Sequence, residues 1–463
     1  MDAGAEARPW YRRHARLLVA AAALAVVAVL VVQAYRKDTS ELPVYTLAGD
    51  RMAQGQEIYR PDEPKPFTYP PFFALPFVPF RWLPEAVHRG VFVVVNVAAL
   101  ALVFRLLWRL LAPIVGARDR RAQVAYWVLV LLLSSRHLTS VLENQSHDLL
   151  VLLPLLAGVV AWARGRCVGT GAGVGLAVAA KATPLVFVPV LAWQRHYKAA
   201  AVAVAALVVA TLLPDWLCPR ADGGSWVGAW ADTFLEGLTP GEAATAEGAW
   251  SSWNKLNQSL SGTLYRLSFF EGPAREHYWD VRVWAPSVGL YKVVLYGLQL
   301  ALIGATAFLC LPRFLADVGP GERGFRVLGQ AGLLVCCMVL LSPMSSKSHF
   351  CVLLLPIAFA GADFVFRRRD PALLVLFLVL LALGPLSSKG VLRPFFGKDL
   401  GVGPTSAGDL FLARGSVTGC ALAAWLAAGH ALFHRARAAR RQVERAFAGT
   451  RPAGQASTDA SAS

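Results

Sequence analysis

Two carboxylates lie close together just beyond an apolar run near the start of the chain. Asp38 and Glu41 follow the run Leu17–Ala34 and stand directly before the segment "LPVYTLAGDRMA". At a membrane surface, such a carboxylate can act as a general base that removes a proton from an attacking hydroxyl. Alternatively, both side chains are solvated charges that cap a following helix. The choice depends on which side of the membrane this segment faces.

A lysine stands between two apolar half-helices in "GVGLAVAAKATPLVFVP". An ionisable side chain is costly at that depth unless it has a partner, so Lys181 is a functional candidate by default. The alternative is that Lys181 caps the carbonyl groups of the broken helix.

The composition is that of an integral membrane protein. Of the 463 residues, 56% are hydrophobic and only 16% are charged. The mean hydropathy of +0.49 exceeds what a soluble domain tolerates. Apolar runs recur over residues 17–433 and leave no room for a separate soluble core. We therefore expect one all-α domain, a polytopic membrane helical bundle.

The apolar runs can be placed by length, because a helix needs about 20 residues to cross the hydrocarbon layer. The expected spans are Leu17–Ala34, His88–Ala112, Ala122–Thr139, Leu149–Ala163, Lys198–Leu213, Gly289–Leu311, Phe325–Ser342, Phe350–Phe366, Ala372–Leu386 and Asp409–Phe433. Residues 169–198 are expected to form a broken hairpin interrupted at "KATP", since Pro184 cannot donate a helical hydrogen bond. With this hairpin the bundle has about 12 transmembrane helices.

Clusters of Lys and Arg in the short loops orient the bundle. They lie at 117–121, 164–166, 194–198, 320–326 and 366–370. All fall on one face, which the positive-inside rule assigns to the cytoplasm. The N-terminal residues 1–16 and the basic, then disordered tail 434–463 are expected on that face too. The net charge of +16 therefore reflects orientation and attraction to anionic lipid, and we expect no nucleic-acid partner.

The opposite face receives the long connections, at 35–87, 140–148, 214–288, 343–349 and 387–408. The two carboxylates are therefore expected to be extracytoplasmic. In "VYTLAGDRMAQGQEIY", Val44, Leu47 and Ala48 fall on one side, which predicts a short amphipathic helix at the interface. The following "FTYPPFFALPFVPFRWLP" is typical of a membrane-edge aromatic belt. The seven Cys are scattered, so we expect no disulfide.

The order of four segments along the chain is informative. They are "ELPVYTLAGDRMAQGQEIY" with "FTYPPFFALPFVPFRWLP", "GVGLAVAAKATPLVFVP", "NQSLSGTLYRL" and "LLSPMSSKSHFCVLLLP". Together they resemble glycosyltransferase family 87, the polyprenyl-phosphate-mannose-dependent mannosyltransferases of the GT-C superfamily. The likeness runs from about Glu41 to about Pro356. It implies a GT-C-type bundle with helices in its extracytoplasmic loops.

The resemblance also implies a reaction. Enzymes of this family transfer a hexose, best known as mannose, from a polyprenyl phosphate to an acceptor hydroxyl on the outer side, with inversion at the anomeric carbon. The implied partners are this donor, a lipid or glycan acceptor and membrane lipids. The expected location is the plasma membrane, with both termini of the chain in the cytoplasm. No cofactor and no metal are expected, although Asp38, Glu41 and Asp148 could together hold a divalent cation.

The family motif has an Asp before "x-x-Val-Tyr", where this chain has Glu41. Glu is one methylene longer, and catalytic geometry tolerates little error. Either the local backbone is retracted to compensate, or Asp38, one helical turn earlier, serves instead. We favour Glu41 as the base.

The resemblance further implies a set of substrate-binding residues. They are Tyr45, Tyr69, Gln145, Asp148, Lys181, Asn257, Gln258, Lys347 and His349. Amides and carboxylates suit sugar hydroxyls, and cations suit the phosphate. Two positions depart from the family, since Asp148 replaces an Asn and Ser348 replaces a His. The loop amides could instead satisfy neighbouring backbone groups, and His349 could face water at a helix start.

Two other functional classes remain open at this stage. A transporter or flippase for a lipid-linked substrate would also use broken helices and midplane charge. A noncatalytic membrane scaffold would explain the departures at Glu41 and Ser348. Product formation from a lipid-linked sugar separates the enzyme from both alternatives.

Overall fold

The computed structural model describes residues 41–234, 250–271, 279–316, 318–398, 400 and 406–449, with side chains as far as 438, and a few residues between 25 and 36. All regular structure in these ranges is helical, which confirms the all-α prediction. Asp38 and most of the run Leu17–Ala34 lie outside the described residues.

Seven helices of the described residues are long and apolar enough to cross a membrane. They are α4 (Glu85–Val115), α5 (Arg120–Asn144), α9 (Tyr197–Leu217), α13 (Val288–Leu309), α14 (Pro320–Leu340), η4 with α15 (Lys347–Leu353 and Leu354–Phe366), and Ser416–Ala438 of α19 (Ser416–Gly449). The number is eight if α16 (Pro371–Leu383), η5 (Pro385–Ser387) and the bent α17 (Lys389–Phe396) count as one span. The chain is a multi-pass membrane protein, and the count of about 12 helices stays a prediction.

Shorter apolar helices complete the bundle: α6 (Asp148–Ala163), α7 (Cys167–Ala180) and η2 with α8 (Thr183–Val186 and Phe187–Trp193). At the centre lies α14, which packs against α4, α6, α15 and α19. Of the residues in its apolar 18-residue stretch, 94% are buried in the protein, compared with 17% in the corresponding stretch of α9. The helix α9 therefore lies at the periphery, where its apolar side chains can face lipid.

The predicted break in the hairpin is present. The helix α7 ends at Ala180, and Lys181 has an extended backbone with φ −157° and ψ 122°. At one end of the bundle, Lys181 contacts Asp148 at the start of α6. At the other end, the ring of His196, just before α9, lies 6.4 Å from the ring of Trp162 near the end of α6. The two short helices therefore return to the end from which they began, as expected.

Glycines explain how closely α7 fits between its neighbours. A Cβ atom on Gly171 or Gly175 would come within 2.5 Å of a carbonyl oxygen of α9, and one on Gly173 would meet the backbone of α6. These residues allow close helix packing in the membrane. The glycines of "GTGAGVG" are thus structural.

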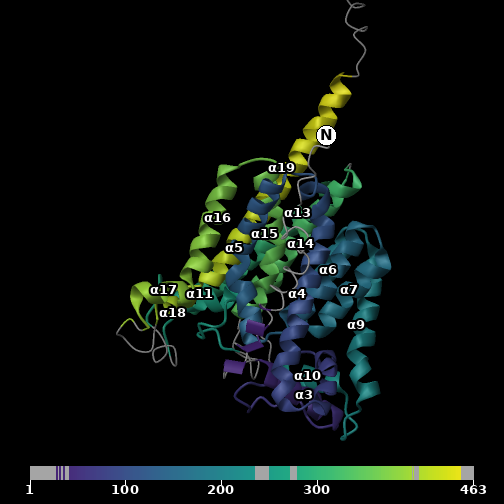
Figure 1. Cartoon of the computed structure of the whole chain (residues 1–463), viewed down its shortest axis with the longest axis vertical. Helices are drawn as coiled ribbons and strands as arrows, with labels where there is room; N and C mark the ends of the chain where they lie inside the picture. Colours follow the sequence, from purple (N-terminus) through teal and green to yellow (C-terminus); the bar gives the residue numbers. More distant parts are fainter. Residues whose placement is uncertain are drawn as a thin grey trace, which may run out of the picture.

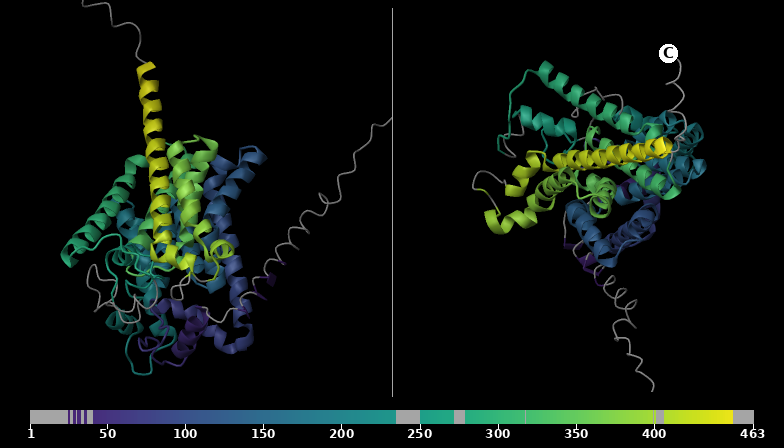
Figure 2. Two further views of the ribbon diagram at one scale, coloured as in Figure 1. Left: turned by 90° about the vertical axis from the view of Figure 1, so that its left-hand side faces the viewer. Right: turned by 90° about the horizontal axis from the view of Figure 1, so that it is seen from above.

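Three helices are tied together at the end that carries the basic loops. Arg435 of α19 pairs with Glu322 of α14 at 2.8 Å and with Asp363 of α15 at 2.9 Å. Figure 1 shows this end at the top, where α19 projects beyond the other helices, and Figure 2 shows the same projection from the side. The clusters at 320–326 and 366–370 therefore share one end of the bundle.

The opposite end carries the helices of the long connections. They are α3 (Leu42–Ala53), η1 (Pro71–Trp82), α10 (Trp226–Phe234), α11 (Leu260–Ser268) and α18 (Ala407–Ala413), and Figure 1 shows α3 and α10 below the bundle. A short turn at the basic end, η3 (Pro312–Phe314), follows α13 and accepts a hydrogen bond from Arg326 at 3.1 Å. The predicted helix at α3 is confirmed.

The aromatic stretch after α3 differs from its prediction. Phe73, Phe77 and Phe80 are buried against α3 and its surroundings, and among the aromatic residues of the stretch Trp82 is the exposed one, at 73%. The stretch is therefore a core for α3, not a membrane-edge belt. Gly49 makes this contact possible, since a Cβ there would lie 2.5 Å from the backbone of Phe77.

Candidate active site

A cavity of about 340 Å³ lies at the end of the bundle that carries α3. Its walls come from three of the long connections and the turn between α5 and α6. The lining residues are Glu41, Val44, Pro64, Lys65, Pro66, Thr68, Tyr69, Asn144, Ser146, Trp250, Leu256, Met344, Ser346, Lys347, Ser348 and His349. The volume and the mixture of apolar walls with a few polar groups are typical of a small-molecule site.

Glu41 is the carboxylate on the cavity wall. Its backbone N–H donates to the carbonyl oxygen of Asn144 at 2.9 Å, which fastens the start of α3 to the end of α5. Glu41 occupies the N-cap position of α3, but its side chain makes no capping hydrogen bond. Its Oε1 lies 3.9 Å from Nζ of Lys65. The capping role that the sequence left open therefore does not apply to Glu41.

Cationic and polar groups surround this carboxylate. Lys65 and Lys347 line the cavity from two different connections, and His349, which is buried, lines it as well. The Nδ1 atom of His349 accepts a hydrogen bond from the backbone N–H of Ser346 at 3.2 Å, which orients the ring at the start of η4. One acid and several groups able to bind anionic oxygen atoms thus share one space.

Lys181 and Asp148, both predicted to bind substrate, bind each other. Nζ of Lys181 lies 2.7 Å from Oδ1 of Asp148, and the Ser146 hydroxyl donates to Oδ2 at 2.6 Å. Both side chains are buried, and neither lines the cavity. The ammonium is 6.0 Å from the ring centroid of Tyr69, which does line it. The ion pair therefore lies directly behind the cavity wall.

An aromatic layer supports the same wall. Tyr45 is fully buried, and its hydroxyl and Nδ1 of His147 form a hydrogen bond of 2.9 Å. The His147 ring lies 4.3 Å from that of Tyr69. Burial lowers the pKa of His147 well below its usual value, an effect that the neighbouring Asp148 carboxylate partly opposes. Tyr45 and a neutral His147 thus form a second layer behind Tyr69.

Three predicted amides lie outside the cavity lining. Asn257 donates to the carbonyl oxygen of Pro343 at 3.0 Å, and Gln258 donates to those of Lys255 and Leu412, both at 2.7 Å. This is the backbone role that the sequence left open for them. Gln145 is buried in a left-handed backbone conformation (φ 51°), and its amide atoms have no hydrogen-bond partner within the described residues.

Sequence reasoning missed several of the lining residues. Lys65 stands between two prolines in "EPKPF", an unusual setting for a solvated lysine that could have marked it. The turn between α5 and α6 was predicted correctly, but Gln145 itself does not line the cavity. Its neighbours Asn144 and Ser146 line it, and Gln145 between them has a left-handed backbone conformation. Arg136 of α5 does not line the cavity either; it donates to the carbonyl oxygen of Leu383 at 2.8 Å and so caps α16.

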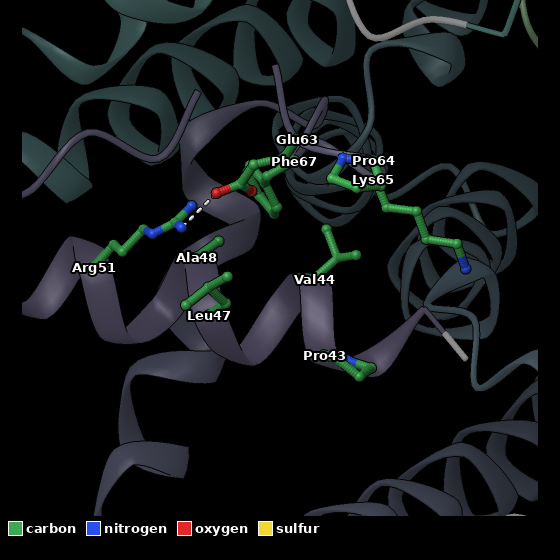
Figure 3. A pocket seen from close by; sticks show the side chains of 9 residues that line it. All are labelled: Pro43, Val44, Leu47, Ala48, Arg51, Glu63, Pro64, Lys65 and Phe67. Carbon is green, nitrogen blue, oxygen red and sulfur yellow. Dashed lines mark hydrogen bonds and ion pairs between the residues drawn. The ribbon is translucent and has the colours of Figure 1, made fainter. Parts of the chain in front are cut away.

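A groove of about 460 Å³ adjoins the cavity along α3. Figure 3 shows Val44, Leu47 and Ala48 of α3 facing the segment 63–67, with Arg51 and Glu63 paired at one end and Lys65 toward the other. The nitrogen and oxygen of that pair are 2.5 Å apart. Val44, Pro64 and Lys65 line both spaces, so the groove and the cavity are neighbours that share these residues. The predicted face of Val44, Leu47 and Ala48 is one wall of this groove.

Within the described part of the chain, no three His, Cys, Asp or Glu side chains are grouped so that they could hold a metal ion. Of the three carboxylates considered above as possible ligands of a divalent cation, Asp148 is bound to Lys181. All seven cysteines are free.

Comparison with known proteins found a family and a relative that this chain resembles in sequence. The sequence profile of glycosyltransferase family 87 matches residues 67–343. A polyprenol-phosphate-mannose-dependent alpha-(1-2)-phosphatidylinositol pentamannoside mannosyltransferase of Mycolicibacterium smegmatis is 29% identical over 302 residues, which cover 64% of this chain and 61% of that relative. No solved structure matches. Because the profile covers more than half of the sequence, this chain belongs to glycosyltransferase family 87.

Proposed function

We propose that this protein transfers a hexose, with mannose the first candidate, from a polyprenyl phosphate to an acceptor hydroxyl, with inversion and with Glu41 as general base. The observation that carries the proposal is the cavity in which Glu41, Lys65, Lys347 and His349 meet. A base beside the hydroxyl and cations beside the leaving phosphate are what such a transfer requires. The relative's dependence on polyprenol phosphate mannose supports the donor and the sugar.

The shared wall of cavity and groove suggests how the donor lies. Lys65 lines both spaces, so a phosphate bound by its ammonium has the sugar on the cavity side and the lipid on the groove side. The groove wall of Val44, Leu47 and Phe67 is apolar and suits the first part of a prenyl chain. Lys347, which also lines the cavity, binds the same phosphate, and His349 contacts sugar hydroxyls.

Lys181 and Asp148 act in this proposal as positioning residues. Their ion pair holds the wall that carries Tyr69 and Ser146, both of which line the cavity. Lys181 could reach a phosphate only if this pair opened, at the cost of a buried carboxylate without its partner.

The proposed orientation follows the positive-inside rule. The end with the basic loops is cytoplasmic, together with both termini, and the cavity opens on the extracytoplasmic side of the plasma membrane. A polyprenyl-phosphate sugar presented on the outer leaflet would then reach the cavity beside α3.

The test uses the purified full-length protein with a panel of polyprenyl-phosphate hexoses and membrane lipid extracts as acceptors. Mass spectrometry of the products should show an acceptor heavier by one hexose, most abundantly from the mannose donor. The Glu41→Gln variant should yield little product. Absence of product from every donor, or full activity of Glu41→Gln, would contradict the proposal. Uptake of the donor into vesicles without product would support a transporter instead.

A further inference from the structure

A second cavity lies between α17 and α18, and it shares no lining residue with the first. The helix α17 begins directly after η5 and is bent by 69° from the direction of α16. None of its eight residues is buried. Because α16 belongs to the bundle that spans the membrane, α17 leaves it near the membrane surface and runs close to the plane of that surface.

The residues of α17 are arranged as in an interfacial helix. Val391 and Phe395 are one turn apart, and Leu392 and Phe396 are one turn apart beside them, which makes an apolar strip. Phe395 is 78% exposed and Phe396 is 55% exposed. Lys389 and Arg393, also one turn apart, border this strip. Apolar side chains beside cations at a membrane surface are typical of a helix that lies in the interface.

The cationic side chains of α17 line a cavity of about 340 Å³. Its lining includes Lys389, Arg393 and Lys398 from the α17 side and Asp409 from α18. Asp409 is already bound by Lys389 at 2.9 Å and by Lys255 at 3.2 Å. Neither Arg393 nor Lys398 makes an ion pair within the described residues. Positive charge in this cavity therefore exceeds the negative charge that the described lining supplies.

We propose that α17 lies in the adjacent leaflet and that this cavity binds the phosphate of an anionic bilayer phospholipid. Arg393 and Lys398 contact the phosphate, and Phe395 and Phe396 lie among the acyl chains. The charge of the lining favours an anionic headgroup, since each cation near a membrane surface is attracted to anionic lipid. The proposal rests on the membrane bundle alone and is independent of the sugar-transfer reaction.

The test is photolabelling of the full-length protein in phosphatidylcholine nanodiscs that contain a trace of lipid with a photoactivatable acyl chain. The label is carried either by phosphatidylglycerol or by phosphatidylcholine, and mass spectrometry measures its incorporation into the peptide that contains residues 389–398. We expect severalfold more incorporation from phosphatidylglycerol. Equal incorporation from the two lipids, or none from either, overturns the proposal.

Two variants separate charge from insertion. The double variant Arg393→Glu with Lys398→Glu should abolish the preference for phosphatidylglycerol and leave labelling by phosphatidylcholine unchanged. Phe395→Ser with Phe396→Ser should lower labelling by both lipids. Arg369→Glu, at an exposed position at the other end of the bundle, is the matched control and should change neither. A preference that survives loss of Arg393 and Lys398 would place the lipid elsewhere.

A competition arm separates the bilayer lipid from the sugar donor. Unlabelled polyprenyl phosphate, added at the same mole fraction as the photoactivatable phosphatidylglycerol, should leave labelling of 389–398 unchanged. Its displacement of the label at that ratio would overturn the proposal and assign the site to the donor.

Discussion

Lys181 and Asp148 lie 33 residues apart in the chain and form a buried ion pair, with Nζ and Oδ1 2.7 Å apart. Each residue on its own suggested contact with substrate. Their pairing instead fastens the broken hairpin to the start of α6, directly behind Tyr69 and Ser146. The energetics of such a pair are asymmetric, because removal of one partner leaves the other charge buried without compensation.

The first prediction concerns this pair. Lys181→Met or Asp148→Asn alone should destabilise the protein by about 3–5 kcal/mol. The double variant should recover most of that loss, since no unpaired charge remains. Thermal unfolding of the purified protein in detergent measures the effect. A Lys181→Met protein as stable as the wild type, but unable to use donor, would restore Lys181 as a phosphate ligand.

The second prediction concerns Glu41. Glu41→Gln keeps the shape of the side chain and loses proton acceptance, so transfer should fall by roughly a hundredfold or more. Glu41→Asp tests the departure from the family. Substantial activity of this variant would mean that the backbone suits the shorter acid. A loss of activity almost as large as that of Glu41→Gln would mean that the backbone is retracted to fit Glu. Asp38→Asn should cost less than Glu41→Gln. An active Glu41→Gln with an inactive Asp38→Asn would transfer the catalytic role to Asp38.

The third prediction concerns the donor phosphate. Lys65→Ala and Lys347→Ala should each raise the KM for the donor, by about tenfold, because each removes a charge-assisted hydrogen bond to phosphate. Lys198→Ala, which removes an exposed lysine at the opposite end, is the control and should leave KM unchanged. Steady-state kinetics with varied donor concentration measures this. An unchanged KM in both variants would argue against a phosphate between them.

The fourth prediction concerns pH. The pKa of His147 is lowered by burial, so in the folded protein the ring stays neutral below the usual value of about 6.5. The unfolded state therefore binds the extra proton first as the pH falls. The stability linked to this group is fully present above about pH 6.5 and is lost as the pH falls toward the folded pKa, at up to about 1.4 kcal/mol per pH unit.

His147→Gln removes that titration. The variant should be less stable than the wild type at pH 7.5, because the contact with Tyr45 is altered. The difference should narrow as the pH is lowered to 5. Thermal midpoints of the two proteins across this range are the measurement, and a constant gap would show that His147 does not titrate on unfolding.

The fifth prediction concerns sidedness. Ala117 lies in a basic loop, and the backbone N–H of Ala221 donates to the carbonyl oxygen of Gly55 near α3 at 2.9 Å. Single cysteines at these two positions, in a background without the native seven, should be labelled from opposite sides of the membrane. Labelling of both from outside would mean that the helix count is wrong.

The sequence by itself determined the fold class, the helical nature of the bundle and the break at Lys181. These features depend on local rules, since apolar length sets a membrane helix and proline removes a helical hydrogen bond. It also determined which end carries the basic loops, which the Arg435 network confirms for the clusters at 320–326 and 366–370.

The tertiary structure alone decided which of the candidate side chains meet. The motif residues around positions 41, 145, 257 and 347 come from separate connections, and sequence order does not state which face of a turn each side chain occupies. The sequence therefore did not show that Lys181 pairs with Asp148. It also did not show that Asn257 and Gln258 donate to loop carbonyl groups. Lys65 escaped notice because its importance arises only where the segment 64–69 folds back against Glu41. A contact between distant segments depends on the packing of the whole bundle, and no local pattern encodes it.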